Sequence, residues 1–246
     1  MRISLIVPCW RELSAARTFA DRWSEVPEVE LIFGLAREAA DLASFLSTRG
    51  VKASISTAAG RGRQMNEAVR LATGEILLFH HIDSVLTPEH LASLCREMGD
   101  ASRVGGAFYR KFDERHPQLR CLEPIERWHN RSFGALYGDQ SLFVRRSVFE
   151  ALGGYADFPL MEDVEFSRRL RRAGSIVMLD PPMESSPRRH LEGGAWRTTL
   201  TNVAMLLGYH LGVPPAALHR WYYRKPFSAN PPPASVQSLA AETHKP

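Results

Sequence analysis

Short apolar runs separated by amphipathic stretches characterise the first part of the chain. The apolar runs predict strands, and apolar residues at helical spacing between them predict helices. Pro8 follows the first run and is expected to end it, because proline cannot donate a ladder hydrogen bond. The expected strands cover residues 2–7, 29–33 and 51–55, and the expected helices cover residues 13–23 and 38–48. This alternation is typical of a parallel α/β sheet.

The second half is less regular, which favours a mixed central sheet flanked by helices. With 246 residues and 44% hydrophobic content, the chain can bury one substantial core, so we expect a single domain over residues 1–225. Residues 226–246 contain few large apolar side chains and are expected to form a disordered tail. The expected strands here cover residues 104–112, 141–144 and 176–179, and the expected helices cover residues 88–98, 122–133, 147–152, 162–173 and 196–211.

An apolar run from Glu75 to Phe79 ends abruptly in His80-His81-Ile82-Asp83-Ser84. Because strand side chains alternate in direction, we expect His81 and Asp83 to point the same way. An imidazole beside a carboxylate at the carboxyl end of a strand can hold a divalent cation. On this run alone, a structural interpretation is favoured, in which Asp83-Ser84 caps the helix that begins near Pro88 and His81 is a buried histidine.

Composition narrows the class of protein only slightly. The net charge of +4 is too small to indicate a nucleic-acid partner. No apolar run approaches the roughly 20 residues that span a bilayer. The N-terminus is not organised as a signal peptide, so we expect a cytoplasmic protein. Cys9, Cys95 and Cys121 are widely spaced and form no CxxC pair, which indicates reduced thiols.

Two further runs carry charged residues next to predicted helices. Gly60-Arg61-Gly62-Arg63 precedes a short helix at residues 64–72, where glycines, helix N-terminal amides and arginine forks favour anion binding. A solvated loop is an equal alternative. Gly138-Asp139-Gln140 offers a carboxylate and an amide to sugar-like hydroxyls, and a simple turn is again an equal alternative.

Met161-Glu162-Asp163-Val164-Glu165 places three carboxylates in the first turn of a helix. Acids at this position stabilise the helix dipole, and Glu165 can pair with Arg169, so a structural role explains the run well. Asp163 shares a helical face with apolar residues and is therefore the acid that we expect to turn inward. A partly buried carboxylate beside a substrate hydroxyl can act as a general base.

Taken in order, these motifs resemble the family 2 glycosyltransferases of the GT-A fold. The resemblance spans about residues 2–212, and His81-Ile82-Asp83 stands in the place of the family's Asp-x-Asp motif. The other runs that carry it are Ser4-Leu5-Ile6-Val7-Pro8 with Glu12, residues 60–66, residues 74–79, Tyr137-Gly138-Asp139-Gln140, Leu152-Gly153-Gly154-Tyr155 and residues 161–165.

The resemblance implies a Rossmann-like fold of the nucleotide-diphospho-sugar transferases and an inverting transfer of a sugar to an acceptor hydroxyl. It implies that Mn²⁺ or Mg²⁺ is held chiefly by Asp83, with His81 nearby, and neutralises the diphosphate. Asp163 would be the general base, and Glu162 would help to position the substrates. The donor site would include Pro8, Glu12, Arg61, Arg63, His81 and Asp83, and the acceptor site would include Asp139 and Gln140.

The chain departs from the family pattern in two places. Family members commonly carry an acidic run after the second strand, where an aspartate contacts the nucleobase, but Phe33-Gly34-Leu35-Ala36 stands there in this chain. His81 replaces the first aspartate of the metal motif, which removes a negative charge and favours Mn²⁺ over Mg²⁺. The missing aspartate leaves a catalytically degenerate nucleotide-sugar binding module as one alternative. A nucleotidyltransferase, which shares a nucleotide-binding α/β sheet and a metal but attacks phosphorus, is the other.

The C-terminal part of the chain bears on a narrower resemblance and on a possible partner. The His-x-Asp form, the Gly138-Asp139-Gln140 run and Arg197-Thr198-Thr199-Leu200 resemble a bacterial subgroup of radical-SAM/selenodomain-associated transferases, some of them linked to arsenosugar synthesis. The helix expected at residues 196–211 is best explained as a core helix. A peripheral membrane contact is the alternative, because Arg188, Arg189 and His190 precede this helix.

Overall fold

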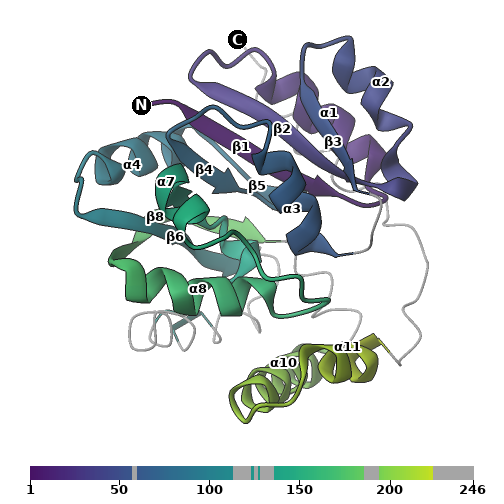
Figure 1. Ribbon diagram of the computed structural model, residues 1–246, viewed down its shortest axis with the longest axis vertical. Coiled ribbons are helices and arrows are strands. Elements are labelled where there is room, and N and C mark those ends of the chain that lie inside the picture. The colour runs from purple at the N-terminus through teal and green to yellow at the C-terminus, as the bar shows by residue number, and fades with distance from the viewer. Residues whose placement is uncertain (57–59, 113–122, 125–126, 128–135, 186–193, 224–246) are drawn as a thin grey trace.

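The chain forms an eight-stranded mixed sheet with helices packed against it (Figure 1). This computed structural model describes residues 1–56, 60–112, 123–124, 127, 136–185 and 194–223. The strand order is β3-β2-β1-β4-β7-β6-β8-β5. The predicted mixed α/β fold is therefore confirmed.

The first half of the sheet is parallel, as its alternating pattern predicts. Strand β1 (Ile3–Cys9) lies between β2 (Val29–Ala36) and β4 (Ile76–Phe79), and β3 (Lys52–Ser56) lies outside β2. The chain thus moves outward from β1 on one side and then returns to its other side. In open α/β sheets, ligands bind beyond the carboxyl ends of the strands at such a switch point.

The helices of the first half follow from local signals. Helices α1 (Leu13–Trp23) and α4 (Pro88–Met98) have the predicted bounds, and Pro88 occupies the first turn, where a missing N–H costs nothing. The expected helix at residues 38–48 is divided into η1 (Arg37–Ala39) and α2 (Leu42–Ser47). Helix α3 (Arg61–Val69) begins earlier than expected, directly in the basic run.

The second half is mixed. Strand β7 (Phe143–Arg145) is antiparallel to β4 and to β6 (Arg103–Phe112), whereas β8 (Ser175–Ser185) is parallel to β6 and antiparallel to β5 (Ser84–Val85). The connecting elements are η2 (Gly138–Gln140), α7 (Arg146–Ala151) and α8 (Glu162–Ala173). Helix α8 has the predicted bounds.

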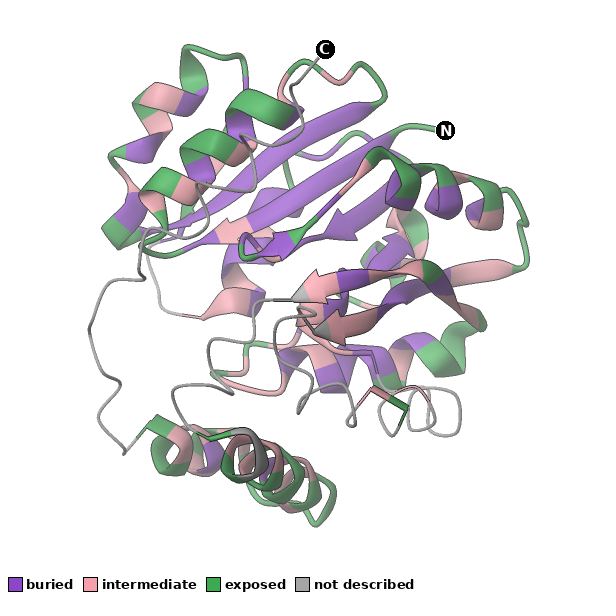
Figure 2. Ribbon diagram, turned by 180° about the vertical axis from the view of Figure 1, so that it is seen from behind, coloured by how far each residue is buried: buried purple, intermediate pink, exposed green. Residues whose placement is uncertain are grey.

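Two apolar clusters fill the two sides of the sheet. Alternate residues of β1 belong to different clusters, with Leu5 packed beside α1, α2 and α4, and Ile6 packed beside α3, α7 and α8. At the edge of the sheet, β3 is partly exposed, whereas β1, β2 and β4 are buried on both faces (Figure 2). This explains why they appear in the sequence as continuous apolar runs.

One expectation about a strand end needs correction, and three further features lie outside the described residues. Pro8 does not end β1, which continues to Cys9. A backbone N–H at position 8 would point towards β4, as the backbone polar groups of Ile6 do. Pairing with β4 has already ended at Ile6, so the missing N–H of Pro8 removes no hydrogen bond from the sheet. Most of the helix expected at residues 122–133, the tail at 226–246 and Cys121 lie outside the described residues.

The C-terminal described segment forms a pair of helices. Helix α10 (Ala195–His210) is close to its predicted bounds and is followed by Gly212 in a left-handed conformation. Helix α11 (Pro215–Tyr223) was not predicted. Pro214 and Pro215 were expected to end the preceding helix, but Pro215 instead occupies the first position of a new one. Among the described helices, none is both long enough and apolar enough to cross a membrane.

Candidate active site

The turn after β4 brings His81 and Asp83 together. Strand β4 ends at Phe79, so their proximity arises from a turn and not from the expected strand alternation. The imidazole Nδ1 of His81 contacts the carboxylate Oδ1 of Asp83. The Asp83 side chain remains 57% exposed, so this pair is open to a ligand.

The structural interpretation of Asp83-Ser84 as a helix cap is wrong. Helix α4 is capped by Thr87, and the side chain of His90 contacts the Thr87 backbone N–H in a reciprocal capping box. The Asp83 carboxylate therefore does not serve to begin this helix.

His80 is a structural residue beneath the His81 and Asp83 pair. Its ring nitrogens lie 2.8 Å from the Ser141 hydroxyl and 3.1 Å from the Ser84 carbonyl, and its ring stacks on Phe19. Burial lowers the pKa of His80 to about 3, so the imidazole is neutral at physiological pH. Its hydrogen bonds hold the turn after β4 against the turn before β7.

The N-terminal ends of α3 and α8 meet through Arg61. The Arg61 Nε donates to Glu162 Oε1 at 2.9 Å, and its Nη2 lies 3.5 Å from Asp163 Oδ2. The same Asp163 oxygen accepts a hydrogen bond from the Gly138 N–H at 2.7 Å. One arginine and one backbone amide therefore orient the two acids at the start of α8.

Opposing effects of burial and neighbouring charges act on the pKa values of Asp163 and Arg61. Burial and the neighbouring Glu162 carboxylate raise the pKa of Asp163, while Arg61 and the backbone N–H groups of Gly138 and Val164 act in the opposite direction. Burial would lower the pKa of Arg61, but the Glu162 and Asp163 carboxylates outweigh it and raise that pKa. Arg61 is therefore charged, and Asp163 is a more basic carboxylate than an ordinary aspartate.

The expectation that Asp163 is the acid drawn furthest inward is corrected. The side chains of Glu162 and Glu165 are 8% and 11% exposed, whereas the Asp163 side chain is 19% exposed. Glu162 is buried against α3, where it lies beside Gly62 and pairs with Arg61, whereas Glu165 pairs with Arg169 within α8. The predicted pair between Glu165 and Arg169 is confirmed at 2.6 Å.

The Gly138-Asp139-Gln140 run forms the turn η2 beside this group. Gln140 is buried, and its side-chain carbonyl accepts from the Tyr137 N–H at 3.0 Å, so it shapes the turn. Asp139 pairs with Arg110 from β6. Burial would raise the pKa of Asp139, but Arg110, with His81 and Arg61, lowers it.

The other candidate donor residues occupy different positions. Pro8 lines a small pocket at the carboxyl end of β1, whose other lining residues are Arg61, Met65, Phe79, His80, His81, Gly138 and Tyr155. Glu12 accepts hydrogen bonds from the Trp10 and Arg11 N–H groups at 3.0 and 2.9 Å, so it stabilises the turn after β1.

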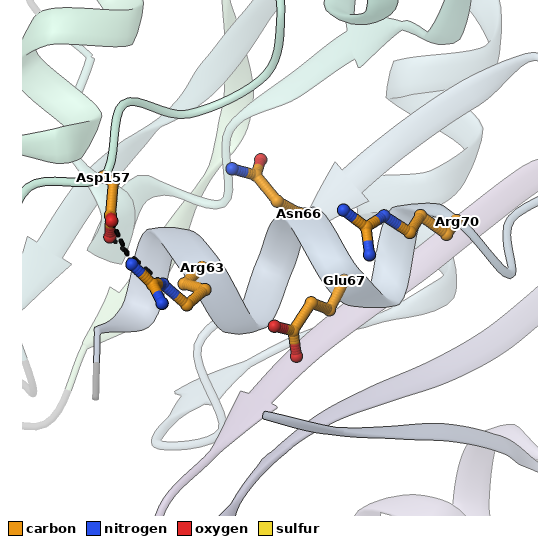
Figure 3. A pocket seen from close by; sticks show the side chains of 5 residues that line it. All are labelled: Arg63, Asn66, Glu67, Arg70 and Asp157. Atoms are coloured by element: carbon orange, nitrogen blue, oxygen red, sulfur yellow. Dashed lines mark hydrogen bonds and ion pairs between the residues drawn. The ribbon is translucent and has the colours of Figure 1, made fainter. Parts of the chain in front are cut away.

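Arg63 points away from this pocket. It pairs with Asp157 in a separate surface depression on the outer side of α3, beside Asn66, Glu67 and Arg70 (Figure 3). Positions two apart on a helix point in nearly opposite directions, which separates Arg63 from Arg61. The structure thus joins Pro8, Arg61, His81, Asp83, Asp139, Glu162 and Asp163 in one region and leaves Arg63 outside it.

Two residues that the sequence argument missed lie at the ends of β1 and β2. The residues that stand in place of the family's acidic run belong to β2 itself, and Gly34 cannot carry a side chain, because a Cβ would lie 2.7 Å from the Gln64 carbonyl. The first acid beyond β2 is Glu38. Hydrogen bonding to its own backbone N–H and to the Trp10 side chain lowers the pKa of Glu38. Trp10 is 49% exposed. The signal available in the sequence was a tryptophan shortly after the first predicted strand.

The donor set suits a divalent cation that takes its remaining ligands from a substrate. In the described part of the chain, no group of three or more His, Cys, Asp or Glu side chains is arranged to hold a metal. His81 and Asp83 supply one nitrogen and one carboxylate donor in contact with each other. Cations in nucleotide enzymes often bind one or two protein side chains and the substrate phosphates, so this pair fits. An imidazole favours Mn²⁺ over Mg²⁺.

Comparison with protein families independently supports the resemblance to glycosyltransferases. Residues 36–153 match the model of the family described as Glycosyl transferase family 2. The matched segment includes Arg61, His81, Asp83 and Asp139, and it ends before the acids of α8. A search of curated proteins finds no match.

Several solved glycosyltransferases share the fold. The mannosyltransferase PcManGT from Pyrobaculum calidifontis, solved with GDP-Man and Mn²⁺, aligns with a TM-score of 0.59 at 17% identity over 75% of this chain and 56% of its own. TarS 1-349 from S. aureus aligns with a TM-score of 0.56 at 16% identity over 78% and 63% of the two chains.

A third relative is glucosyl-3-phosphoglycerate synthase from Mycobacterium tuberculosis, solved with Mn²⁺, UDP and glucosyl-3-phosphoglycerate. It aligns with a TM-score of 0.52 at 14% identity over 75% of this chain and 70% of its own. This chain covers 56% of the mannosyltransferase and 63% of TarS 1-349, which is less than two thirds of each. The comparisons establish the GT-A glycosyltransferase fold for this chain and a match to glycosyl transferase family 2 over residues 36–153.

Proposed function

We propose that the protein is an inverting, metal-assisted glycosyltransferase that moves a sugar from a nucleotide-diphosphate donor to an acceptor hydroxyl. The observation that carries the proposal is the convergence of two groups at the switch point of the sheet. One is the His81 and Asp83 pair after β4, and the other is the Asp163 and Glu162 pair, held by Arg61. Asp139 follows Gly138 in η2, whose backbone N–H donates to Asp163.

His81 and Asp83 are the residues that would hold the cation, Mn²⁺ or Mg²⁺. When bound, the cation supplies positive charge that neutralises the diphosphate as it leaves. Pro8 and Arg61 line the same pocket and would contact the donor. Trp10 and Glu38 are further candidates for contact with the nucleobase, because an exposed ring and a carboxylate lie at the ends of β1 and β2.

Asp163 is the proposed general base. Its raised pKa makes it a better proton acceptor than an ordinary aspartate, and its partial exposure lets an acceptor hydroxyl approach. The acceptor oxygen would bond to the anomeric carbon as the bond to the diphosphate oxygen breaks, and the hydroxyl proton would pass to Asp163. Asp139 and Glu162 would position the acceptor and donor, while Gln140 would act through the turn that it holds.

Three finer assignments accompany this proposal. A cytoplasmic location and membership of the bacterial radical-SAM/selenodomain-associated subgroup stay predictions from the sequence. So does the division into a single domain over residues 1–225 and a tail over residues 226–246.

Donor binding can be tested by thermal shift with UDP, GDP, CDP and dTDP, each with and without Mn²⁺. Ligand binding to the native state raises the melting temperature, so one diphosphate should raise it only when metal is present. The Asp83→Ala variant should lose this shift. The matched control is Asp157→Ala, which removes an exposed acid outside the site and should keep it. A shift that does not require metal, or none at all, would contradict the proposed donor site.

Turnover of the nucleotide sugar identified in this way tests the reaction. Release of nucleoside diphosphate supports sugar transfer, whereas release of pyrophosphate from a nucleoside triphosphate would instead indicate a nucleotidyltransferase. Asp163→Asn should keep the thermal shift and lower kcat by about 10²–10⁴, because only the proton acceptor is lost. Asp157→Asn should leave kcat unchanged. Unchanged kcat in Asp163→Asn would exclude this residue as the base.

A further inference from the structure

Helix α10 exposes a stripe of apolar side chains. Leu200, Val203, Leu207 and Leu211 are 65%, 47%, 58% and 84% exposed. Their spacing of three or four residues places them on one face of the helix and its C-terminal end. We call these four residues the leucine stripe. Water-facing apolar side chains scattered singly are ordinary, but a continuous row marks an interaction surface.

The opposite face of α10 is the more buried one, and among the described elements it packs chiefly against α11. Met205 is 2% exposed, and burial raises the pKa of the Tyr209 hydroxyl, on which the charges of Arg168 and Glu165 in α8 also act. Leu218 of α11 packs against Gly208. Both ribbon views show α10 and α11 as a pair beyond α8, away from the sheet (Figures 1 and 2). The core-helix explanation therefore applies to one face of α10 and leaves the leucine stripe unexplained.

The charges of this helix pair are all of one sign. Residues 195–223 contain no Asp or Glu, and their two arginines, Arg197 and Arg220, are exposed. Arg197 lies one turn before Leu200, next to the stripe. Trp221 is also 50% exposed, and amphipathic aromatic rings of this kind favour the boundary between lipid headgroups and hydrocarbon. This combination suits an anionic, partly apolar surface.

A second copy of the chain is a poorer fit to the same surface. A stable protein interface buries about 800 Å² on each partner and involves roughly 20 residues a side. Four side chains on one helix fall well short of that. A lipid surface requires no matching shape, and its anionic headgroups complement the arginines.

We propose that α10 and α11 form a membrane-surface anchor that lies in the headgroup region of anionic bilayers, with the leucine stripe facing the acyl chains. The arginines attract the protein to the surface, and the stripe holds it there. This inference is independent of the proposed transfer reaction, because none of its residues belongs to the candidate active site.

Flotation of the full chain with lipid vesicles tests the anchor. The protein should float with vesicles of phosphatidylcholine and phosphatidylserine, and much less with phosphatidylcholine alone. The double variant Leu200→Gln/Leu207→Gln should lower the partition coefficient by at least about tenfold, since each buried leucine contributes substantially to transfer from water. Arg197→Gln should lower it about fivefold, and raised salt should weaken binding similarly.

The matched control is Asn202→Gln, an exposed polar position on α10 outside the leucine stripe, which should float like the wild type. Circular dichroism establishes that each variant is folded. The proposal is overturned if the wild type does not float with anionic vesicles, or if the double leucine variant floats equally well. It is also overturned if light scattering shows a dimer that the double leucine variant separates, because the stripe would then join two copies.

Discussion

Arg61 reaches from α3 to both acids at the start of α8, and its charge lowers the pKa of Asp163. Without it, the repulsion between the Glu162 and Asp163 carboxylates would raise the pKa of Asp163 further. With Arg61 in place, two carboxylates lie beside one guanidinium. The group then has a net charge of −1, which suits a site that accepts a proton. The function of Asp163 therefore depends on two neighbours of opposite sign.

The pH dependence of donor turnover should report these neighbours separately. On acidification, kcat/KM should fall as Asp163 becomes protonated, at a pH above the ordinary range for an aspartate. Glu162→Gln removes a negative neighbour, lowers the pKa of Asp163 and moves this limb to lower pH. Arg61→Gln removes a positive neighbour and moves it to higher pH. Shifts in the same direction, or no shift in either variant, would show that Asp163 does not control the limb.

At the scale of elements, the site is assembled where α3, η2 and α8 meet. Gly138 allows this meeting, because a Cβ there would lie 1.8 Å from the Arg61 Nη2. Its backbone N–H also donates to Asp163. The absence of a side chain at Gly138 thus leaves room for Arg61, while its backbone N–H, which any residue except proline would supply, orients Asp163.

Gly138→Ala should lower the free energy of unfolding by about 1–3 kcal/mol, because the new methyl group displaces Arg61. Urea unfolding measures this change. In the Arg61→Ala background the same substitution should cost much less, since the clash is absent. Equal costs in both backgrounds would show that Gly138 is required for another reason.

Glu30 joins the strands of the parallel half. Its carboxylate accepts hydrogen bonds from the Ser4 hydroxyl at 2.5 Å, from the Thr73 N–H at 2.7 Å and from Lys52 Nζ at 2.7 Å, and its side chain is 5% exposed. Burial alone would raise its pKa, but these partners lower the pKa from its ordinary 4.5 to about 2. The ionised form is therefore favoured by folding.

Glu30→Gln should lower the free energy of unfolding near neutral pH by about 2–3 kcal/mol. A carboxyl group with a lowered pKa stabilises the fold above its unfolded pKa and loses that contribution as the pH falls through its folded pKa. The difference between variant and wild type should therefore shrink between pH 4.5 and about 2. Urea unfolding across this range checks it, with the exposed Glu25→Gln as control. A difference that does not change with pH would mean that packing, and not charge, explains the effect.

At the scale of the whole molecule, the strand order determines where chemistry can occur. Strands β1 and β4 are adjacent although β2 and β3 lie between them in the sequence, so their carboxyl ends open one pocket. Strand β7 pairs with β4 and brings the η2 turn and Ser141 to the same edge. Segments from five parts of the chain thus contribute to the site.

The fold should not depend on the C-terminal segment beyond residue 225. Residues 226–246 have few large apolar side chains to bury, so a chain ending at residue 225 should keep its melting temperature and its donor turnover. Differential scanning calorimetry and the turnover assay measure the two properties. A lower melting temperature would indicate that this segment packs against the domain.

The sequence alone predicts the elements and motifs that depend on local patterns. The bounds of α1, α4 and α8 follow from apolar periodicity and end signals, and the meeting of His81 with Asp83 follows from their spacing, although through a turn. These features depend on residues close in sequence. The alternation of continuous apolar runs with amphipathic stretches also indicates the α/β class, since parallel strands that are buried on both faces appear as continuous apolar runs.

Only the tertiary structure decides which side chains share the site. The sequence does not reveal that Arg61 holds the α8 acids while Arg63 turns to Asp157, or that Glu162 is more buried than Asp163. Nor does it show that α10 leaves its leucine stripe exposed. Each of these outcomes depends on packing between segments far apart in the chain, which local periodicity cannot specify.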